Sequence, residues 1–93
     1  MKVLFKEPGK AWRTKLISND LAILQQLVGG YIEVVTVTSD CAVICNEDGR
    51  LLGMPKNVII AGHEFVGPVL LVGVDDDDFS DVPEGLEGIL CQE

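Results

Sequence analysis

A chain of 93 residues is too short for two independent hydrophobic cores, and its formal charge of −8 disfavours direct binding to nucleic acid phosphates. Its apolar fraction of 47% excludes a disordered chain, and the 5% of aromatic residues predicts a core built from Val, Leu and Ile. Its apolar runs are too short for a membrane span or a secretory signal, so we expect a cytoplasmic protein without membrane partners.

The first residues of the chain predict a β-hairpin. Residues 1–6 favour a first strand and residues 11–17 a second, with a Pro-Gly pair between them as a strong turn signal. Because side chains alternate along a strand, Trp12 lies on one face of the second strand, and Arg13 and Lys15 lie on the other.

A short amphipathic helix followed by a strand is the clearest local signal. Residues 18–20, Ser-Asn-Asp, offer capping side chains, and a helical stripe follows at Leu21, Leu24, Leu27 and Val28. The Gly29-Gly30 pair suits the helix end, because glycine adopts a left-handed cap conformation without steric strain. The β-branched residues that follow predict a third strand over 31–38.

The second half of the chain predicts further strands separated by turns. The expected elements are a fourth strand over 41–45, an Asn-Glu-Asp-Gly turn over 46–49, a short fifth strand over 50–53, a strand or helical turn over 58–61 and a last long strand over 65–74. Within the last strand, Gly67-Pro68 predicts a bulge or an edge, because proline cannot donate to a ladder.

These elements predict an α+β fold, in which a mostly antiparallel sheet of five to six strands carries one short helix. We expect a single domain over residues 1–82 and an acidic C-terminal tail over residues 83–93, with a final turn at 86–90. Eight of the fifteen acidic residues follow Val74. One short helix covers little of such a sheet, so either the sheet curls on itself or a second copy buries its other face. We therefore expect a homodimer.

The cysteine pattern predicts neither disulfides nor a metal site. Three cysteines are an odd count, and Cys41 and Cys45 fall on one face of a strand, roughly 13 Å apart at about 3.3 Å per residue. We expect both to be buried as small hydrophobes. The acidic stretch that begins at Asp76 partly matches a calcium loop, but Asp81 stands where that loop needs glycine. No metal and no cofactor is predicted.

Three separated segments agree in order and spacing with one family. They are residues 27–33, 45–57 and 61–73, and they resemble the small proteins grouped as domain of unknown function 3846. The resemblance extends from residue 1 to about residue 82, and it does not include Cys41, Cys91 or the acidic tail. It implies an accessory gene of a phage or other mobile element that acts inside a bacterial host cell.

Six side chains are candidates for ligand binding: Trp12, Arg13, Lys15, Asn46, Asn57 and His63. Trp12 is suited to stacking on a base and the two nearby cations to meeting phosphate, although an ordinary exposed strand has the same pattern. Both asparagines lie within the resembling segments and also suit turns. His63, beside Glu64, is a candidate general base without a nucleophile at motif spacing.

Two functions remain open on this sequence. The first is non-catalytic binding that sequesters a small signalling nucleotide of the host, as a counter-defence protein. The alternative is an acidic protein-interaction module that occupies a basic site on a host protein. An enzyme is not expected, since it requires His63 to meet an acidic residue such as Glu64 or Glu33 in a cleft.

Overall fold

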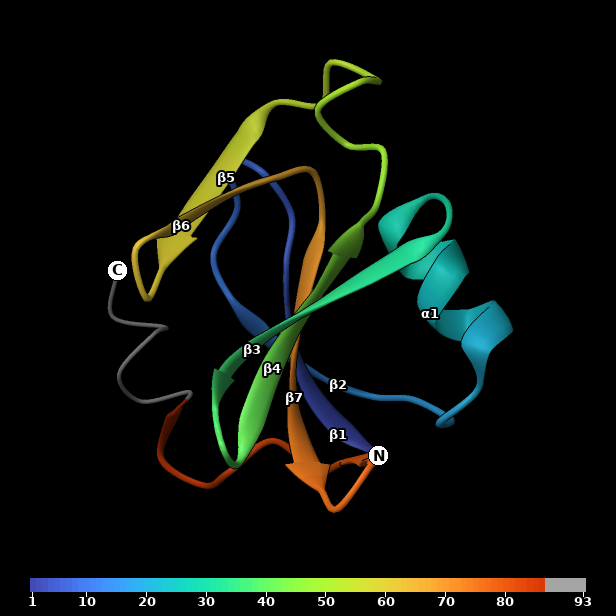
Figure 1. The fold of residues 1–93 in the computed structure, drawn as a ribbon, viewed down its shortest axis with the longest axis vertical. Helices are drawn as coiled ribbons and strands as arrows, with labels where there is room; N and C mark the ends of the chain where they lie inside the picture. The colour runs from blue at the N-terminus through green and yellow to red at the C-terminus, as the bar shows by residue number, and fades with distance from the viewer. Residues whose placement is uncertain (87–93) are drawn as a thin grey trace.

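Residues 1–86 are described by the computed structural model, and within them one helix and eight strands form an α+β fold with antiparallel strand pairs (Figure 1). The elements are β1 (Lys2–Lys6), β2 (Arg13–Leu16), α1 (Leu21–Val28), β3 (Ile32–Thr38), β4 (Cys41–Asn46), β5 (Lys56–Ile60), β6 (His63–Val66), β7 (Val69–Asp75) and β8 (Asp78–Ser80). The predicted fold class is confirmed, and so is the hairpin between the first two strands.

The main sheet has the strand order β2-β1-β7-β4-β3, and β8 pairs with the second half of β7. Since β4 occupies the other side of β7, β8 continues the row of β1. The strands β5 and β6 form a separate two-stranded sheet. The edge strands of the main sheet are therefore β2 and β8 on one side and β3 on the other.

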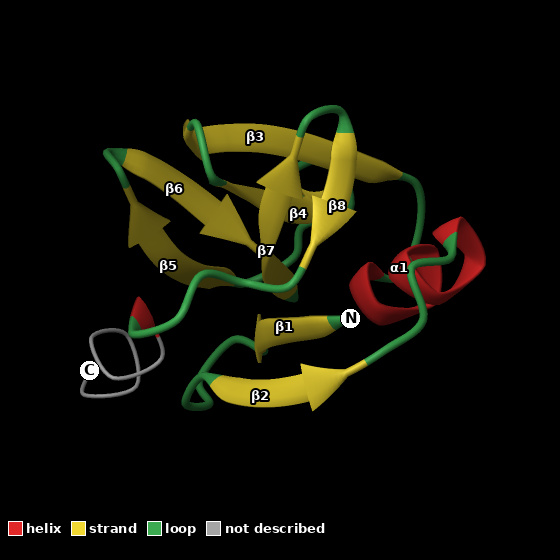
Figure 2. Ribbon diagram, turned by 90° about the horizontal axis from the view of Figure 1, so that it is seen from below, coloured by secondary structure: helices red, strands yellow, loops and turns green. Residues whose placement is uncertain are grey.

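Both faces of the main sheet are covered (Figure 2). Helix α1 lies on one face, which we call the helix-side face, over Val3, Phe5, Ala42, Ile44, Leu70 and Val72. Asp20 caps the helix by accepting from the amide of Ala22, and Gly29 ends it in the left-handed conformation with φ 84°. The predicted helix and both of its caps are thus confirmed.

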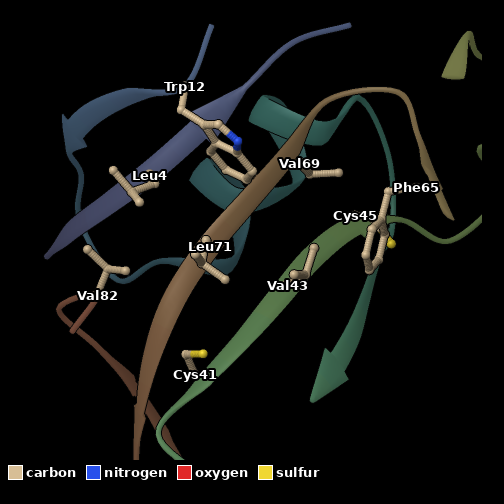
Figure 3. Close-up of a cluster of buried hydrophobic side chains, with 9 residues drawn as sticks. All are labelled: Leu4, Trp12, Cys41, Val43, Cys45, Phe65, Val69, Leu71 and Val82. Carbon is tan, nitrogen blue, oxygen red and sulfur yellow. The ribbon is translucent and has the colours of Figure 1, made fainter. Parts of the chain in front are cut away.

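The β5–β6 hairpin covers the opposite face, which we call the hairpin-side face (Figure 2). Its buried cluster consists of Leu4, Trp12, Cys41, Val43, Cys45, Phe65, Val69, Leu71 and Val82 (Figure 3). Cys41 and Cys45 are both buried in this cluster, as their spacing predicts. Because the chain itself covers this face, face coverage no longer argues for a second copy, and the homodimer stays a prediction.

Two predicted strands are wrong. Residues 50–53 form consecutive turns, in which the amide of Leu52 donates to Asp48 O at 2.9 Å and that of Met54 to Gly49 O at 3.0 Å. The predicted strand over 65–74 is divided into β6 and β7, which belong to different sheets. Gly67 makes this division with φ 71°, and a Cβ there would lie 2.5 Å from the sulfur of Met54.

Strand β8 is absent from the sequence-based expectation. It is short and follows an acidic turn, yet the chain after it is fixed to the start of β1. The amide of Val82 donates to Lys2 O at 2.8 Å, and the amide of Lys2 donates to the Asp81 carboxylate at 2.8 Å. Leu86 packs on the hairpin-side cluster. The predicted turn at 86–90 and Cys91 fall largely or wholly outside the described residues.

Candidate functional site

A cavity of about 430 Å³ lies between the main sheet and strand β6. Its lining comes from β3, from β4 and the turn that follows it, and from the whole of β6 with the glycine before it. The lining residues are Glu33, Val35, Cys45, Asn46, Glu47, Arg50, Leu51, Gly62, His63, Glu64, Phe65 and Val66. The two walls of the cavity therefore belong to different sheets.

The hairpin-side face of the sheet supplies the first wall. Glu33 and Val35 are two residues apart on β3, so they project on the same face, and Cys45 stands opposite Glu33 on β4. The second wall is anchored by Phe65, which is buried beside Cys45 (Figure 3). The neighbouring His63 and Glu64 are exposed, and they form the rim of the cavity.

Glutamates outnumber basic residues in the lining of the cavity. Glu33, Glu47 and Glu64 line it, against Arg50 as the lining guanidinium. Arg50 donates to the main-chain carbonyl of Glu64 at 2.8 Å, which joins the 47–53 turn to β6. Lys56 approaches the Glu64 carboxylate at 3.9 Å from an exposed position, where an ion pair is weak. The cavity therefore favours a positively charged group over an anion.

Cys45 is not an activated nucleophile. Its pKa is raised from 9.0 to about 11, chiefly by burial and also by the charge of Glu33 and a hydrogen bond to it, while Arg50 acts in the opposite direction. The thiol lies 3.8 Å from Glu33 O and 3.9 Å from its Oε1. It therefore stays protonated at neutral pH. Among residues 1–86, no group of three or more His, Cys, Asp or Glu side chains is placed to hold a metal ion.

His63 shares the cavity with Glu33 and Glu64, the two acidic residues that an acid–base site would require. Within the described residues, however, His63 forms no hydrogen bond or ion pair with either glutamate. Its ring instead packs near Phe65, with 6.4 Å between the ring centroids. The cavity thus gathers titratable groups without the hydrogen bond that would orient a general base.

Three candidate residues at the start of the chain do not form a site together. Trp12 is buried on the hairpin-side face, at 5% exposure, so its ring is not open to stack on a base. Arg13 and Lys15 lie on the other face, 5.4 Å and 5.5 Å from the ring centre of Phe5. Arg13 also pairs with Glu7 at 3.0 Å. None of the three candidates lines the cavity.

Asn46 and Asn57 hold the architecture together. The Asn46 side chain lines the cavity but also contacts helix α1 and its own turn. The Asn57 amide donates to Lys6 O at 2.9 Å and to Gly67 O at 2.7 Å, and it accepts from Lys6 Nζ at 2.7 Å. Asn57 lies in a second, shallower hollow of about 400 Å³ beside Lys56 and Glu64. Both amides suit the turn-shaping alternative.

Sequence reasoning missed two charged residues of the cavity. The sequence predicts a tight hairpin turn at Glu47 and a strand at Arg50, whereas the chain makes a wider loop that Arg50 joins to β6. The available signal was the absence of alternation in residues 50–53, Arg-Leu-Leu-Gly, which does not fit a half-buried strand. Glu33 and Glu64 were named only as possible partners of His63.

One family matches this chain. The model of the family described as "Domain of unknown function (DUF3846)" matches residues 1–91, nearly the full length. No curated protein and no solved structure matches the chain. Within residues 1–86, no helix is long and apolar enough to cross a membrane.

Proposed function

Since the chain belongs to the DUF3846 family, a domain of unknown function, we propose its role from the cavity itself. The protein acts as a non-catalytic binding module whose cavity captures a positively charged group of a partner protein. The observation that carries this proposal is that three glutamates and a single arginine line a cavity of about 430 Å³. In the mobile-element setting that the family resemblance implies, the partner is a host protein.

A lysine or arginine side chain fits both the chemistry and the shape of the cavity. Its aliphatic stem packs on Val35, Phe65 and Val66, while its charged head reaches the glutamates at the rim. Each exposed ion pair contributes only about 0–1 kcal/mol. Useful affinity therefore requires additional contacts, which a protein partner supplies and a free amine does not.

Sequestration of a signalling nucleotide is the competing hypothesis. The cavity offers phosphate one guanidinium among three carboxylates, and like charges oppose its entry. Trp12, the side chain expected to stack on the base, is buried in the core. These features favour the protein-interaction alternative, and nucleotides belong in the same binding test.

Catalysis has little support in the cavity. The Cys45 pKa of about 11 keeps the thiol neutral, and His63 is not hydrogen-bonded to Glu33 or Glu64. A nucleophile with an oriented base is therefore missing from the described lining.

Titration followed by backbone NMR tests the proposal. The probes are N-acetyl-argininamide and N-acetyl-lysinamide, with N-acetyl-glutamine amide as the neutral control and AMP and a cyclic dinucleotide as nucleotides. We expect saturable shifts at Glu33, Arg50 and Glu64 with the cationic probes alone. The double substitution Glu33→Gln and Glu64→Gln should abolish them, whereas Glu84→Gln, an exposed glutamate outside the cavity, should not. Binding of a nucleotide without binding of the cations would replace this proposal with sequestration.

A further inference from the structure

The two open edges of the main sheet differ in a way that bears on binding. Strand β2 has four residues, and two of them are Arg13 and Lys15, the kind of short, charged edge that resists pairing. Strand β3 has seven residues, Ile-Glu-Val-Val-Thr-Val-Thr, without lysine or proline. A long edge rich in β-branched residues is a ready template for another strand.

The register shows which backbone groups of β3 face outward. The amide of Glu47 donates to Tyr31 O at 2.9 Å, so the odd residues of β3 up to Val35 direct their backbone groups toward β4, before the register shifts between Thr36 and Thr38. On the far side of β4 the even residues pair with β7, as the 2.8 Å bond from the Val74 amide to Asp40 O shows. Within β3, the N–H and C=O groups of Val34 and Thr36 therefore point to the open edge.

The open edge runs directly beside the cavity. Glu33 and Val35 line the cavity from β3 itself. A strand added to this edge would lie about 4.8 Å from β3, and every second side chain would project on the hairpin-side face. Those side chains would lie beside Glu33, in the cavity that Glu64 also lines. Backbone pairing and charge capture thus fall on one continuous surface, made of the β3 edge and the cavity.

We propose that this surface binds an extended segment of the partner that pairs with β3 and carries lysine or arginine at alternate positions. The inference rests on the proposed function and specifies that the segment of the partner that binds is an extended strand. Main-chain hydrogen bonds to Val34 and Thr36 supply affinity without sequence preference, and the glutamates select the basic side chains. Main-chain hydrogen bonds and ion pairs together supply the affinity that a single exposed ion pair does not.

A second copy of the chain fits this surface less well. Pairing of two β3 strands would bring together two cavities rich in glutamate, on a chain of net charge −8. The β2 strand of another copy presents Arg13 and Lys15 at alternate positions, but Arg13 already pairs with Glu7. A β3-to-β2 contact is also head to tail, so it closes only if the copies form a ring and otherwise extends into a filament.

The test combines a random ten-residue peptide library with two matched variants. Thr36→Pro removes an outward donor and leaves the ladder to β4 intact, because an edge strand tolerates proline where the N–H faces solvent. Thr36→Ala keeps the donor. We expect selected peptides to carry lysine or arginine at every second position. They should bind the Thr36→Ala variant like the unchanged chain and lose at least tenfold in affinity for Thr36→Pro.

Two further measurements keep the test decisive if Thr36→Pro folds poorly. N-methylation of alternate amides on one edge of a selected peptide should abolish binding to the unchanged chain. Hydrogen exchange in the complex should slow at Val34 and Thr36 and remain unchanged at Leu16 on the β2 edge.

Four results overturn the inference. Peptides that survive both Thr36→Pro and N-methylation would show capture by the cavity alone, which leaves the proposed function standing. Selected peptides without basic residues would contradict both proposals. Enrichment of no peptide, while N-acetyl-argininamide still binds, would remove the extended segment but keep the cavity. Concentration-dependent association of the free chain in sedimentation, reversed by Thr36→Pro, would assign the edge to a second copy.

Discussion

The side-chain amide of Asn46 donates to the main-chain carbonyl of Val28 at 3.1 Å, and so ties the end of β4 to the last residue of α1. The same side chain accepts from the amide of Asp48 at 2.8 Å. Gly30 lies so close that a Cβ there would be 2.9 Å from Asn46 Nδ2. One buried amide therefore fixes the turn that carries Glu47 and Arg50 relative to the helix.

Replacing Asn46 with alanine should destabilise the fold. The change leaves the Val28 carbonyl and the Asp48 amide without this partner, which costs about 2 kcal/mol or more when such groups are buried. Urea unfolding measures the loss. Gln26→Ala, at an exposed position of the same helix, serves as the control and should stay within about 0.5 kcal/mol. An unchanged unfolding midpoint for Asn46→Ala would contradict the assigned role.

Gly73→Ala should release the β8 segment from the sheet. A Cβ at Gly73 would collide with the main-chain oxygen of Asp81 and lie 2.7 Å from Ser80 Oγ. Because backbone cannot move aside as a flexible side chain does, we expect faster hydrogen exchange at Val82 together with lower stability. In Gly9→Ala, the new methyl group has open space and only left-handed strain, about 1 kcal/mol, so exchange at Val82 should not change.

The raised pKa of Cys45 predicts a loss of stability at high pH. The folded thiol holds its proton up to about pH 11, whereas the unfolded thiol ionises near 9.0. The contribution is complete below the unfolded value and is lost as the pH rises toward the folded one. Between these values, the stability of the unchanged chain should fall more steeply than that of Cys45→Ala in urea unfolding.

Glu33→Gln should lower the Cys45 pKa, because both the charge of Glu33 and its hydrogen bond raise it. Difference titration of the thiolate absorbance, with Cys41→Ala and Cys91→Ser in the background, follows the change. Glu84→Gln is the charge-matched control. Equal pKa values in the two variants would show that burial alone sets the shift.

Substitution of Trp12 should lower the stability of the fold far more than substitution of Arg13 or Lys15. Trp12→Ala removes a buried ring and should cost about 3–5 kcal/mol, while Arg13→Ala and Lys15→Ala should each cost less than about 1 kcal/mol. Neither Arg13→Ala nor Lys15→Ala should change the NMR response to N-acetyl-argininamide. A lost response in Arg13→Ala or Lys15→Ala would place ligand recognition on β2 after all.

The sequence predicts correctly those elements that are determined by interactions between neighbouring residues. The α1 helix has its own stripe and its own caps, and the first hairpin has its own turn, so each follows from a few neighbouring residues. Gly67 and residues 50–53 failed for the opposite reason. The conformation of Gly67 depends on Met54, and the loop over 50–53 is joined to the distant β6 strand through Arg50, so neither follows from neighbouring residues alone.

The cavity also combines features that neighbouring residues determine with features that distant residues determine. Placing Cys45 on the buried face needs only strand alternation, and the same alternation puts Glu33 and Val35 on one face of β3. Trp12 was misjudged because its burial comes from a hairpin formed more than forty residues later. Glu33 and Glu64 line the same cavity because the small sheet packs on the main sheet, and the periodicity of a strand does not predict how two sheets pack.

The division of the apolar run at Gly67 has a mechanical consequence. The two walls of the cavity share no ladder, so the distance between them depends in part on a few hydrogen bonds, those of Asn57 and that of Arg50. Buried Phe65 and the partly buried Val58 and Ile60 also hold the hairpin on the main sheet. Under the proposed function, substitution of Asn57, which does not line the cavity, would change which side chains the cavity accepts.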